Sequence, residues 1–194
     1  MKRIGIVSEN YNNDSIAVGR LLKKKYSDQA VFVPLLKSIS GKGLDEIRKV
    51  VKILKDEIKQ KKIDLLILVR DLDGLTSEKK KINTIESWAE KIQKQLVINP
   101  QLFIVIFELE AFILADIETF NKIYKLKYQL KTSPKFQSEP KELLKQITRK
   151  SKRKYKESDA PEIFQQLNFQ KIYQNHKGQN SFQSFIKELE NTLN

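Results

Sequence analysis

The feature that most constrains the fold is an alternation of short apolar runs with amphipathic stretches over the first 116 residues. Two runs, Asp64–Val69 (DLLILV) and Leu102–Phe107 (LFIVIF), are apolar almost throughout, as strands of a sheet covered on both faces must be. Apolar residues in the stretch between the second and third runs recur at steps of three and four, which indicates a helix. The predicted order is strand Arg3–Val7, helix Ser15–Tyr26, strand Ala30–Leu36, helix Leu44–Lys61, strand Asp64–Val69, helix Ile82–Leu96 and strand Leu102–Phe107.

This order predicts an α/β fold with a mostly parallel four-stranded sheet flanked by helices. Each strand–helix–strand unit closes by a right-handed crossover, which makes its two strands parallel and places the helix on a face of the sheet. Ligand sites in open sheets of this kind lie outside the carboxyl ends of the strands. Residues that directly follow a strand are therefore the first candidates for a functional site.

The remaining residues, 117–194, have a different pattern and predict a basic helical extension packed on a core of residues 1–116. Lys141–Lys150 is predicted to form a short basic helix, and Ser181–Leu193 a closing amphipathic helix. Arg149–Lys156 (RKSKRKYK) is a basic run with one aromatic residue inside it. Asp159 and Pro161 suit the cap and the first turn of another helix.

Charge and composition narrow the classes of function. Lys and Arg outnumber Asp and Glu by 37 to 24, which gives a formal net charge of +13 and favours a polyanionic partner such as nucleic acid. A generally lysine-rich composition accounts for the same excess, so charge does not decide between these interpretations. The absence of cysteine excludes disulfides, cysteine-based zinc sites and thiol nucleophiles, and it suits a reducing compartment. No apolar stretch has the length of a secretory signal or a membrane span, so we expect a cytoplasmic protein without a membrane partner.

Three acidic residues stand where predicted strands end. Glu9 follows the first strand, and Asp71 and Asp73 follow the third, where the two-residue repeat of a strand would point both aspartates to one side. If these strands are neighbours, three carboxylates converge, and hard oxygen ligands of this kind suit Mg²⁺ or Mn²⁺. Such an ion can polarise a phosphoryl oxygen and orient a nucleophile. An acid after a strand is also a common helix cap, and Asp-x-Asp-Gly is also a turn sequence.

The motifs IVSE (Ile6–Glu9) and VRDLDG (Val69–Gly74) resemble those of the toprim domain, over residues 1 to about 115. That domain is shared by topoisomerases, bacterial primases, overcoming-lysogenization-defect (OLD) nucleases and a ribosomal RNA maturase. The resemblance implies a Rossmann-like toprim core, Glu9 as an acid/base or metal-binding residue, and Asp71 and Asp73 as metal ligands. Toprim proteins often carry Gly after the glutamate, whereas Asn10 stands there in this chain.

A narrower resemblance is to small stand-alone toprim-like proteins of bacterial mobile and defence loci, through the phrase ELEAFILAD (Glu108–Asp116). It implies a Mg²⁺-dependent nuclease that acts as a defence effector beside a separate ATPase partner, with Glu110 as a further metal ligand. A helix cap with a salt bridge is the alternative for Glu110. The basic run matches the same proteins. The match implies that Lys154 or Lys156 neutralises the charge of the transition-state phosphate, and Lys156 is the predicted catalytic residue of the two. The predicted nucleic-acid contacts are Arg149, Lys150, Lys152, Arg153, Lys154, Tyr155 and Lys156, with Tyr155 stacked on a base.

Two rival functions stay open. A toprim-like module could bind nucleic acid without chemistry, for which the net positive charge suffices. The phrase DLDGLT (Asp71–Thr76) also resembles the nucleophile motif of haloacid-dehalogenase-type phosphatases, although Leu75 separates the Gly and Thr that adjoin in that family.

Overall fold

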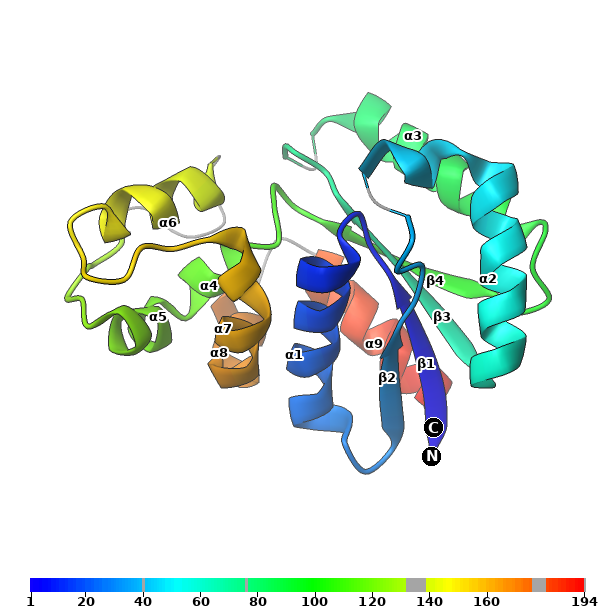
Figure 1. The fold of residues 1–194 in the computed structure, drawn as a ribbon, viewed down its shortest axis with the longest axis horizontal. Coiled ribbons are helices and arrows are strands. Elements are labelled where there is room, and N and C mark those ends of the chain that lie inside the picture. The colour runs from blue at the N-terminus through cyan, green and yellow to red at the C-terminus, as the bar shows by residue number, and fades with distance from the viewer. Residues whose placement is uncertain (40, 76, 132–138, 176–180, 194) are drawn as a thin grey trace.

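The four predicted strands form one fully parallel sheet. In the computed structural model, which describes residues 1–39, 41–75, 77–131, 139–175 and 181–193, the order across the sheet is β2-β1-β3-β4. The strands are β1 (Lys2–Val7), β2 (Ala30–Pro34), β3 (Leu65–Asp71) and β4 (Pro100–Val105). The predicted α/β fold, with its parallel sheet flanked by helices, is confirmed (Figure 1).

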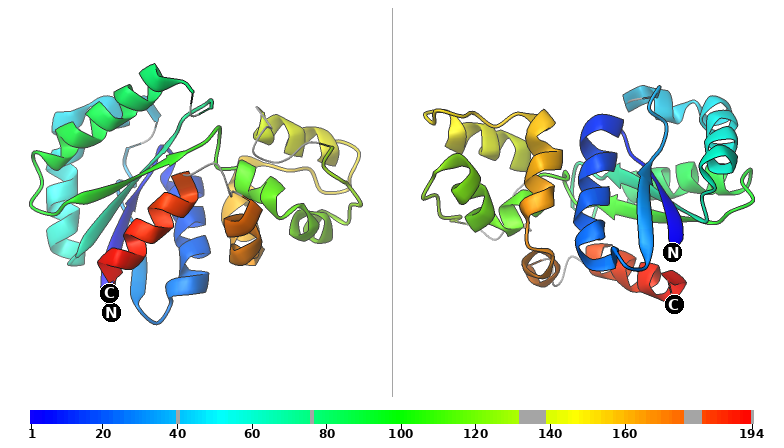
Figure 2. Two further views of the ribbon diagram at one scale, coloured as in Figure 1. Left: turned by 180° about the vertical axis from the view of Figure 1, so that it is seen from behind. Right: turned by 60° about the horizontal axis from the view of Figure 1, so that its bottom comes forward.

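Helices cover both faces of the sheet. Figures 1 and 2 show α2 (Ile47–Lys61) and α3 (Lys79–Gln93) on one face, and α1 (Ile16–Tyr26) and α9 (Ser181–Leu193) on the other. Two short turns, η1 (Tyr11–Ser15) and η2 (Gly41–Asp45), precede α1 and α2. Because strand side chains alternate between faces, Ile6 packs into the hydrophobic core on the α1 side, and its neighbour Val7 packs into the core on the α2 and α3 side.

The helical extension forms a second lobe beside α1. It contains α4 (Ala111–Ala115), which the sequence prediction had placed in the core, and α5 (Ile117–Tyr124), α6 (Pro140–Thr148), η4 (Glu157–Asp159), α7 (Ala160–Gln166) and α8 (Phe169–Asn175). Its buried residues belong to the same hydrophobic core as α1, and α7 lies directly against α1. The lobe and the sheet therefore share one continuous apolar interior.

The last helix leaves this lobe and returns to the sheet. On α9, Phe185 stacks on Phe103 of β4 with ring centroids 4.4 Å apart, and Phe182 lies 5.7 Å from the same ring. The amino and carboxyl termini consequently lie close together (Figure 1), where the Lys2 ammonium group donates to the carbonyl of Thr192. The C-terminal helix thus completes the layer over β4.

Several element boundaries differ from the sequence predictions. Strand β3 continues to Asp71, so this residue is the last of its strand, whereas β2 already ends at Pro34. Asp159 precedes α7 but does not cap it, because its carboxylate accepts hydrogen bonds from the Lys156 N–H (3.2 Å) and the Tyr124 hydroxyl (2.6 Å). Over the residues that the structure describes, no helix combines the length and apolar character needed to cross a bilayer.

Candidate metal centre

The carboxyl edge of the sheet brings the first and third strands together, as the site hypothesis requires. Strands β1 and β3 are hydrogen-bonded neighbours, and Val7 lies beside Leu68 in their register. Glu9 and Asp71 follow these partners by two and three residues, so both lie at this edge. The topological condition for the predicted site is met.

The two acids differ in their immediate partners at this edge. Arg70 follows the face of Leu68, on which α2 and α3 pack, whereas Asp71 follows the face of Val69, on which α1 packs. The Glu9 carboxylate lies with Arg70, at 3.0 Å from Nε, so it forms an ion pair. The same guanidinium lies 3.5 Å from Asp45 and 4.9 Å from the centre of the Trp88 ring. Glu9 is therefore partly neutralised, although it lines a narrow pocket together with Asp71 and its charge raises the pKa of Asp71.

The structure places Asp14, which the sequence analysis missed, beside Asp71. Asp14 lies in the π-helical turn η1, where its Oδ2 accepts the N–H of Asn10 at 3.1 Å. The hydroxyl groups of Ser8 and Ser15 are 2.7 Å apart, and this hydrogen bond ties the turn to the end of β1. Burial, followed by the charge of Glu110, raises the pKa of Asp14 from 3.8 to about 7. In the sequence this residue is one acid in a polar stretch, without a local signal of its role.

Asp71 is the central residue of the group. It is partly buried, and within the described residues its carboxylate accepts no hydrogen bond. Burial raises its pKa well above the usual value, and the negative charges of Asp14, Glu110, Glu9 and Asp73 raise it further, in that order. Its surroundings therefore disfavour the ionised form unless a positive charge is supplied.

Glu110 reaches the group from the start of α4. Its side chain is buried, and Oε1 accepts a hydrogen bond from the Tyr155 hydroxyl at 3.0 Å. Burial raises the pKa of Glu110, although the positive charge of Lys141 and the Tyr155 hydrogen bond oppose the increase. Glu110 is thus held in place by the helical lobe.

Lys141 is a cation whose charge acts on both Asp14 and Glu110. It was not among the basic residues predicted to act at the site. Its ammonium group lies 3.5 Å from the Glu108 carboxylate. Burial opposes its charge, but Glu110 and Glu108 outweigh that effect, so the pKa of Lys141 is raised. Lys141 also lowers the pKa of Asp14, which places its charge within reach of the acidic group.

Asp73 does not continue the side-chain repeat of β3. The strand ends at Asp71, and the backbone of Asp73 has the left-handed conformation, with φ of 49°. Its N–H donates to the Phe107 carbonyl at 3.0 Å, and its own carbonyl accepts from Lys81 at 2.8 Å. Asp73 is exposed, and of the four charges that raise the pKa of Asp71 it has the smallest effect. The strand repeat on which the expectation for the two aspartates rested therefore ends before Asp73.

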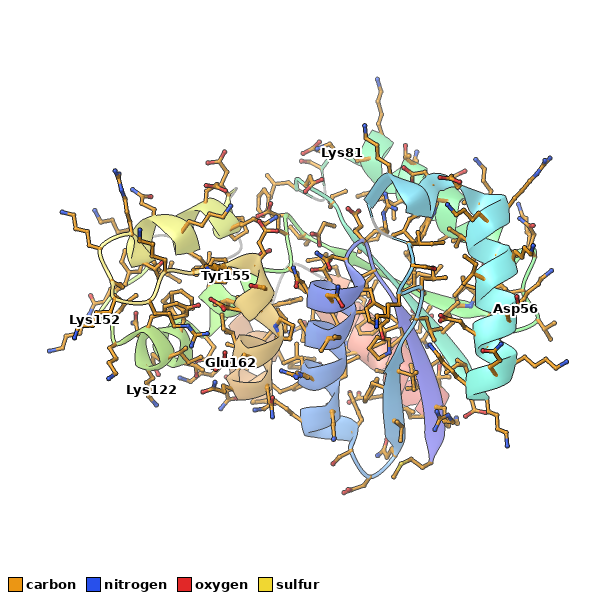
Figure 3. All side chains as sticks on the ribbon, viewed as in Figure 1. Asp56, Lys81, Lys122, Lys152, Tyr155 and Glu162 are labelled. Atoms are coloured by element: carbon orange, nitrogen blue, oxygen red, sulfur yellow. The ribbon has the colours of Figure 1, made fainter. Side chains whose placement is uncertain are left out.

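The predicted basic contacts divide into two groups. Arg149, Lys150, Lys152, Lys154 and Lys156 are exposed, and Figure 3 shows Lys152 on the side of the helical lobe that faces away from the sheet. Arg153 is exposed as well, but its guanidinium lies 2.9 Å from Glu162, 3.3 Å from Asp159 and 5.1 Å from the centre of the Tyr124 ring. It therefore contributes to the packing of the lobe.

Tyr155 differs from its predicted role. Its side chain is only 3% exposed, and its hydroxyl donates a hydrogen bond to Glu110. The ring therefore has no free face on which a base could stack. Its backbone N–H donates to the buried Thr148 hydroxyl at 2.9 Å, which fixes the loop after α6. Tyr155 supports the acidic group rather than presenting an aromatic surface.

The acidic group suits a hard divalent cation. Asp14, Asp71 and Glu110 supply carboxylate oxygens, which are the donors that Mg²⁺ and Mn²⁺ prefer. A narrow pocket at this edge is lined by Ser8, Glu9, Asp14, Val69, Asp71 and Leu109. Over the described ranges, no three acidic side chains lie close enough together to ligate one ion directly. Asp14, Asp71 and Glu110 form one group because the charge of Glu110 raises the pKa of both aspartates, and that of Asp14 raises the pKa of Asp71.

The fold and this edge define a parallel α/β protein with clustered carboxylates beyond its central strands. Comparison with known proteins gives its family: residues 14–190 match the model of the domain of unknown function DUF4276, and the chain belongs to that family. No curated protein and no solved structure matches the chain. The toprim resemblance stays a prediction.

Proposed function

We propose that this protein is a Mg²⁺- or Mn²⁺-dependent phosphodiesterase that hydrolyses nucleic acid, with the ion held at the carboxyl edge of the sheet. One observation carries the proposal. Three carboxylates from separate segments, Asp14, Asp71 and Glu110, share this edge. Burial raises the pKa of each, the charges of acidic neighbours raise it further, and Asp71 has no hydrogen-bond donor in the described chain. A divalent cation relieves that repulsion, because it offsets the cost of holding the charged forms together.

Each residue then has a separate task. Asp71 and Glu110 hold the ion, which when bound would polarise a phosphoryl oxygen. Asp14, which lines the same narrow pocket as Asp71, accepts at its carboxylate a proton from the attacking water. Lys141 stabilises the negative charge that develops on the phosphate, the role predicted earlier for Lys154 or Lys156. Tyr155 keeps Glu110 in position.

The charge of the chain supports a nucleic-acid substrate. The net charge is +13, and exposed lysines and arginines lie on α6 and on the loop after it, in the same helical lobe that supplies Lys141 to the site. Contacts of this kind release counterions from the phosphate backbone, so we expect binding to weaken steeply as salt rises.

A nucleic-acid-binding module without catalysis is the second candidate. It is favoured by the ion pair between Glu9 and Arg70, which leaves one of the predicted metal ligands partly neutralised. Calorimetry separates the two candidates, since only the metal-dependent enzyme should bind Mg²⁺ or Mn²⁺ with a heat that the substitution Asp71→Asn removes.

Cleavage of DNA and RNA by the purified protein tests the enzyme. We expect cleavage with Mg²⁺ or Mn²⁺, none with EDTA, and a loss of at least about a hundredfold for Asp71→Asn, as for other charged catalytic groups. The matched control is Asp64→Asn at the opposite end of the same strand, where the carboxylate accepts the Arg3 N–H at 2.7 Å and the amide oxygen can do the same. If Asp71→Asn cleaves as fast as wild type, the proposed chemistry is wrong.

A further inference from the structure

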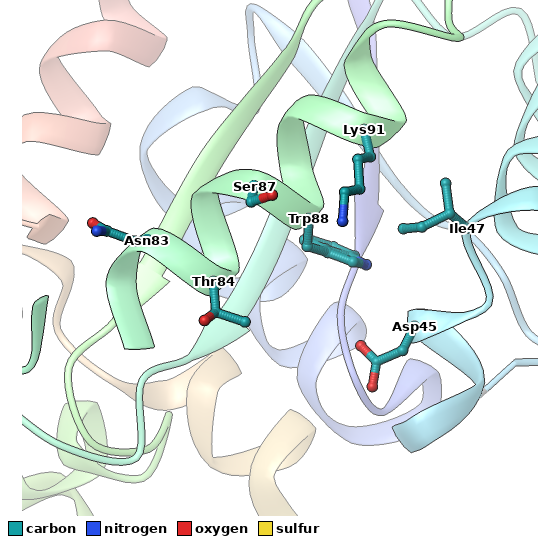
Figure 4. A pocket seen from close by; sticks show the side chains of 7 residues that line it. All are labelled: Asp45, Ile47, Asn83, Thr84, Ser87, Trp88 and Lys91. Atoms are coloured by element: carbon teal, nitrogen blue, oxygen red, sulfur yellow. The ribbon is translucent and has the colours of Figure 1, made fainter. Parts of the chain in front are cut away.

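A second cavity lies on the opposite face of the sheet, between η2, the start of α2 and α3 (Figure 4). Its volume is about 450 Å³, within the range of roughly 300 to 1,000 Å³ that is typical of small-molecule sites. Its lining is mixed: Trp88 and Ile47 form apolar wall, and Asp45 and Lys91 bring opposite charges. Figure 4 shows the indole of Trp88 pointing toward Ile47 and Asp45, with the ammonium group of Lys91 above it.

The polar lining of this cavity is available for a ligand. Asn83, Ser87 and Lys91 follow one another at four-residue intervals along α3, so they form one stripe of the helix. Each is exposed, and none forms a side-chain hydrogen bond or ion pair with another residue of the described chain. The stripe therefore offers an amide, a hydroxyl and an ammonium group beside an aromatic wall.

Arg70 connects this cavity to the acidic edge. Its guanidinium stacks on Trp88 and lies 3.5 Å from Asp45, both of which line the cavity, and its Nε lies 3.0 Å from Glu9. Asp71 is the next residue of the strand. Arg70 thus contacts residues of both places, Trp88 and Asp45 of the cavity and Glu9 of the narrow pocket at the carboxyl edge, and arginine is well suited to a phosphate group between them.

We propose that this cavity binds one nucleobase of a single-stranded segment of the substrate, next to the phosphate that is cleaved. The inference rests on the proposed function. The amide of Asn83, the hydroxyl of Ser87 and the ammonium group of Lys91 supply donors and acceptors that recognise the edge of a base. Ile47 and the small exposed part of Trp88, whose side chain is 7% exposed and whose Nε1–H donates to the Leu44 carbonyl, supply the apolar contact. Arg70 holds the phosphate that links this nucleotide to the metal centre.

Trp88 is the only tryptophan of the chain, so its fluorescence reports on this cavity directly. Wild-type protein in EDTA, where no cleavage occurs, is titrated with each of the four ribonucleoside 5′-monophosphates, and separately with ribose 5-phosphate and inorganic phosphate. We expect a saturable change for at least one nucleotide and a dissociation constant at least about tenfold weaker for the two base-free phosphates, which lack the base contacts.

Two lysine variants provide the matched comparison. Lys91→Ala should weaken nucleotide binding about threefold to tenfold, whereas Lys94→Ala, which removes the same charge from the end of the same helix but does not line the cavity, should leave it unchanged. Asn83→Ala should weaken binding to a similar extent without a change in charge. Equal effects of both lysine variants would reduce the interaction to general charge and overturn the base site.

The failures of the two proposals are distinguishable. No fluorescence response to any nucleotide, or an equal response to inorganic phosphate, overturns the base site even if Mg²⁺-dependent cleavage is observed. Saturable nucleotide binding that depends on Lys91, in a protein that cleaves neither DNA nor RNA, supports the base site and refutes the enzyme.

Discussion

Replacement of Asp14 by asparagine should stabilise the metal-free protein at alkaline pH. In the folded chain the pKa of Asp14 is about 7, against 3.8 without the fold, so the folded state holds a proton that the unfolded state has lost between these values. The unfolded state binds fewer protons there, and stability must fall as the pH rises from about 4 through about 7. Asp14→Asn removes this loss, while its amide oxygen can still accept the Asn10 N–H.

The magnitude follows from the same shift. One pKa unit corresponds to about 1.4 kcal/mol, which sets an upper limit of about 4 kcal/mol for an isolated group. Asp14 is partly exposed and its acidic neighbours share the repulsion, so we expect about 1 to 2 kcal/mol. With a typical urea dependence of about 2 kcal/mol per molar, the unfolding midpoint of the variant should exceed that of wild type by about 0.5 to 1 M at pH 8.

The assay is urea unfolding in EDTA at pH 5 and pH 8, followed by circular dichroism. The variant and wild type should differ much less at pH 5, and millimolar Mg²⁺ should reduce the difference at pH 8 because the ion stabilises wild type. Asp56→Asn is the control, since Asp56 is an exposed carboxylate on α2, far from the acidic edge (Figure 3). A variant less stable than wild type at pH 8, while Asp56→Asn is neutral, would refute the assignment of repulsion to this group.

Three further predictions concern neighbours of the site and the core. Tyr155→Phe removes the hydroxyl that donates to Glu110 and should cost about 1 kcal/mol in urea unfolding, with a weaker Mg²⁺ heat in calorimetry; an unchanged heat would count against a positioning role. Arg70→Gln should destabilise the fold by about 1 to 2 kcal/mol and change the emission of Trp88, since it removes the stacked cation; an unaltered spectrum would contradict the stacking. Phe103→Ala should cost about 3 to 5 kcal/mol and increase amide hydrogen exchange in α9, which packs on that ring; protection of α9 equal to wild type would show that the helix is held elsewhere.

The sequence alone determined the class of fold and the edge at which to look for a site. Apolar runs such as Leu65–Val69 have one favourable environment, the centre of a covered sheet, and the helical stretches between them require parallel crossovers. Positions that follow these runs, Glu9 and Asp71, were therefore placed at the carboxyl edge by chain order. Glu110 was suggested by the resemblance of Glu108–Asp116 to a phrase of stand-alone toprim-like proteins.

Only the tertiary structure decided which side chains meet. The register of β1 against β3 brings the end of one strand beside the end of the other, so that Glu9 pairs with Arg70 and also lines a pocket with Asp71, and register is a property of the paired strands rather than of either segment. Asp14 joins Asp71 because η1 folds back over the end of β1, and Tyr155 reaches Glu110 across 45 residues of sequence. Such contacts depend on burial and on distances between remote segments, so no local pattern encodes them.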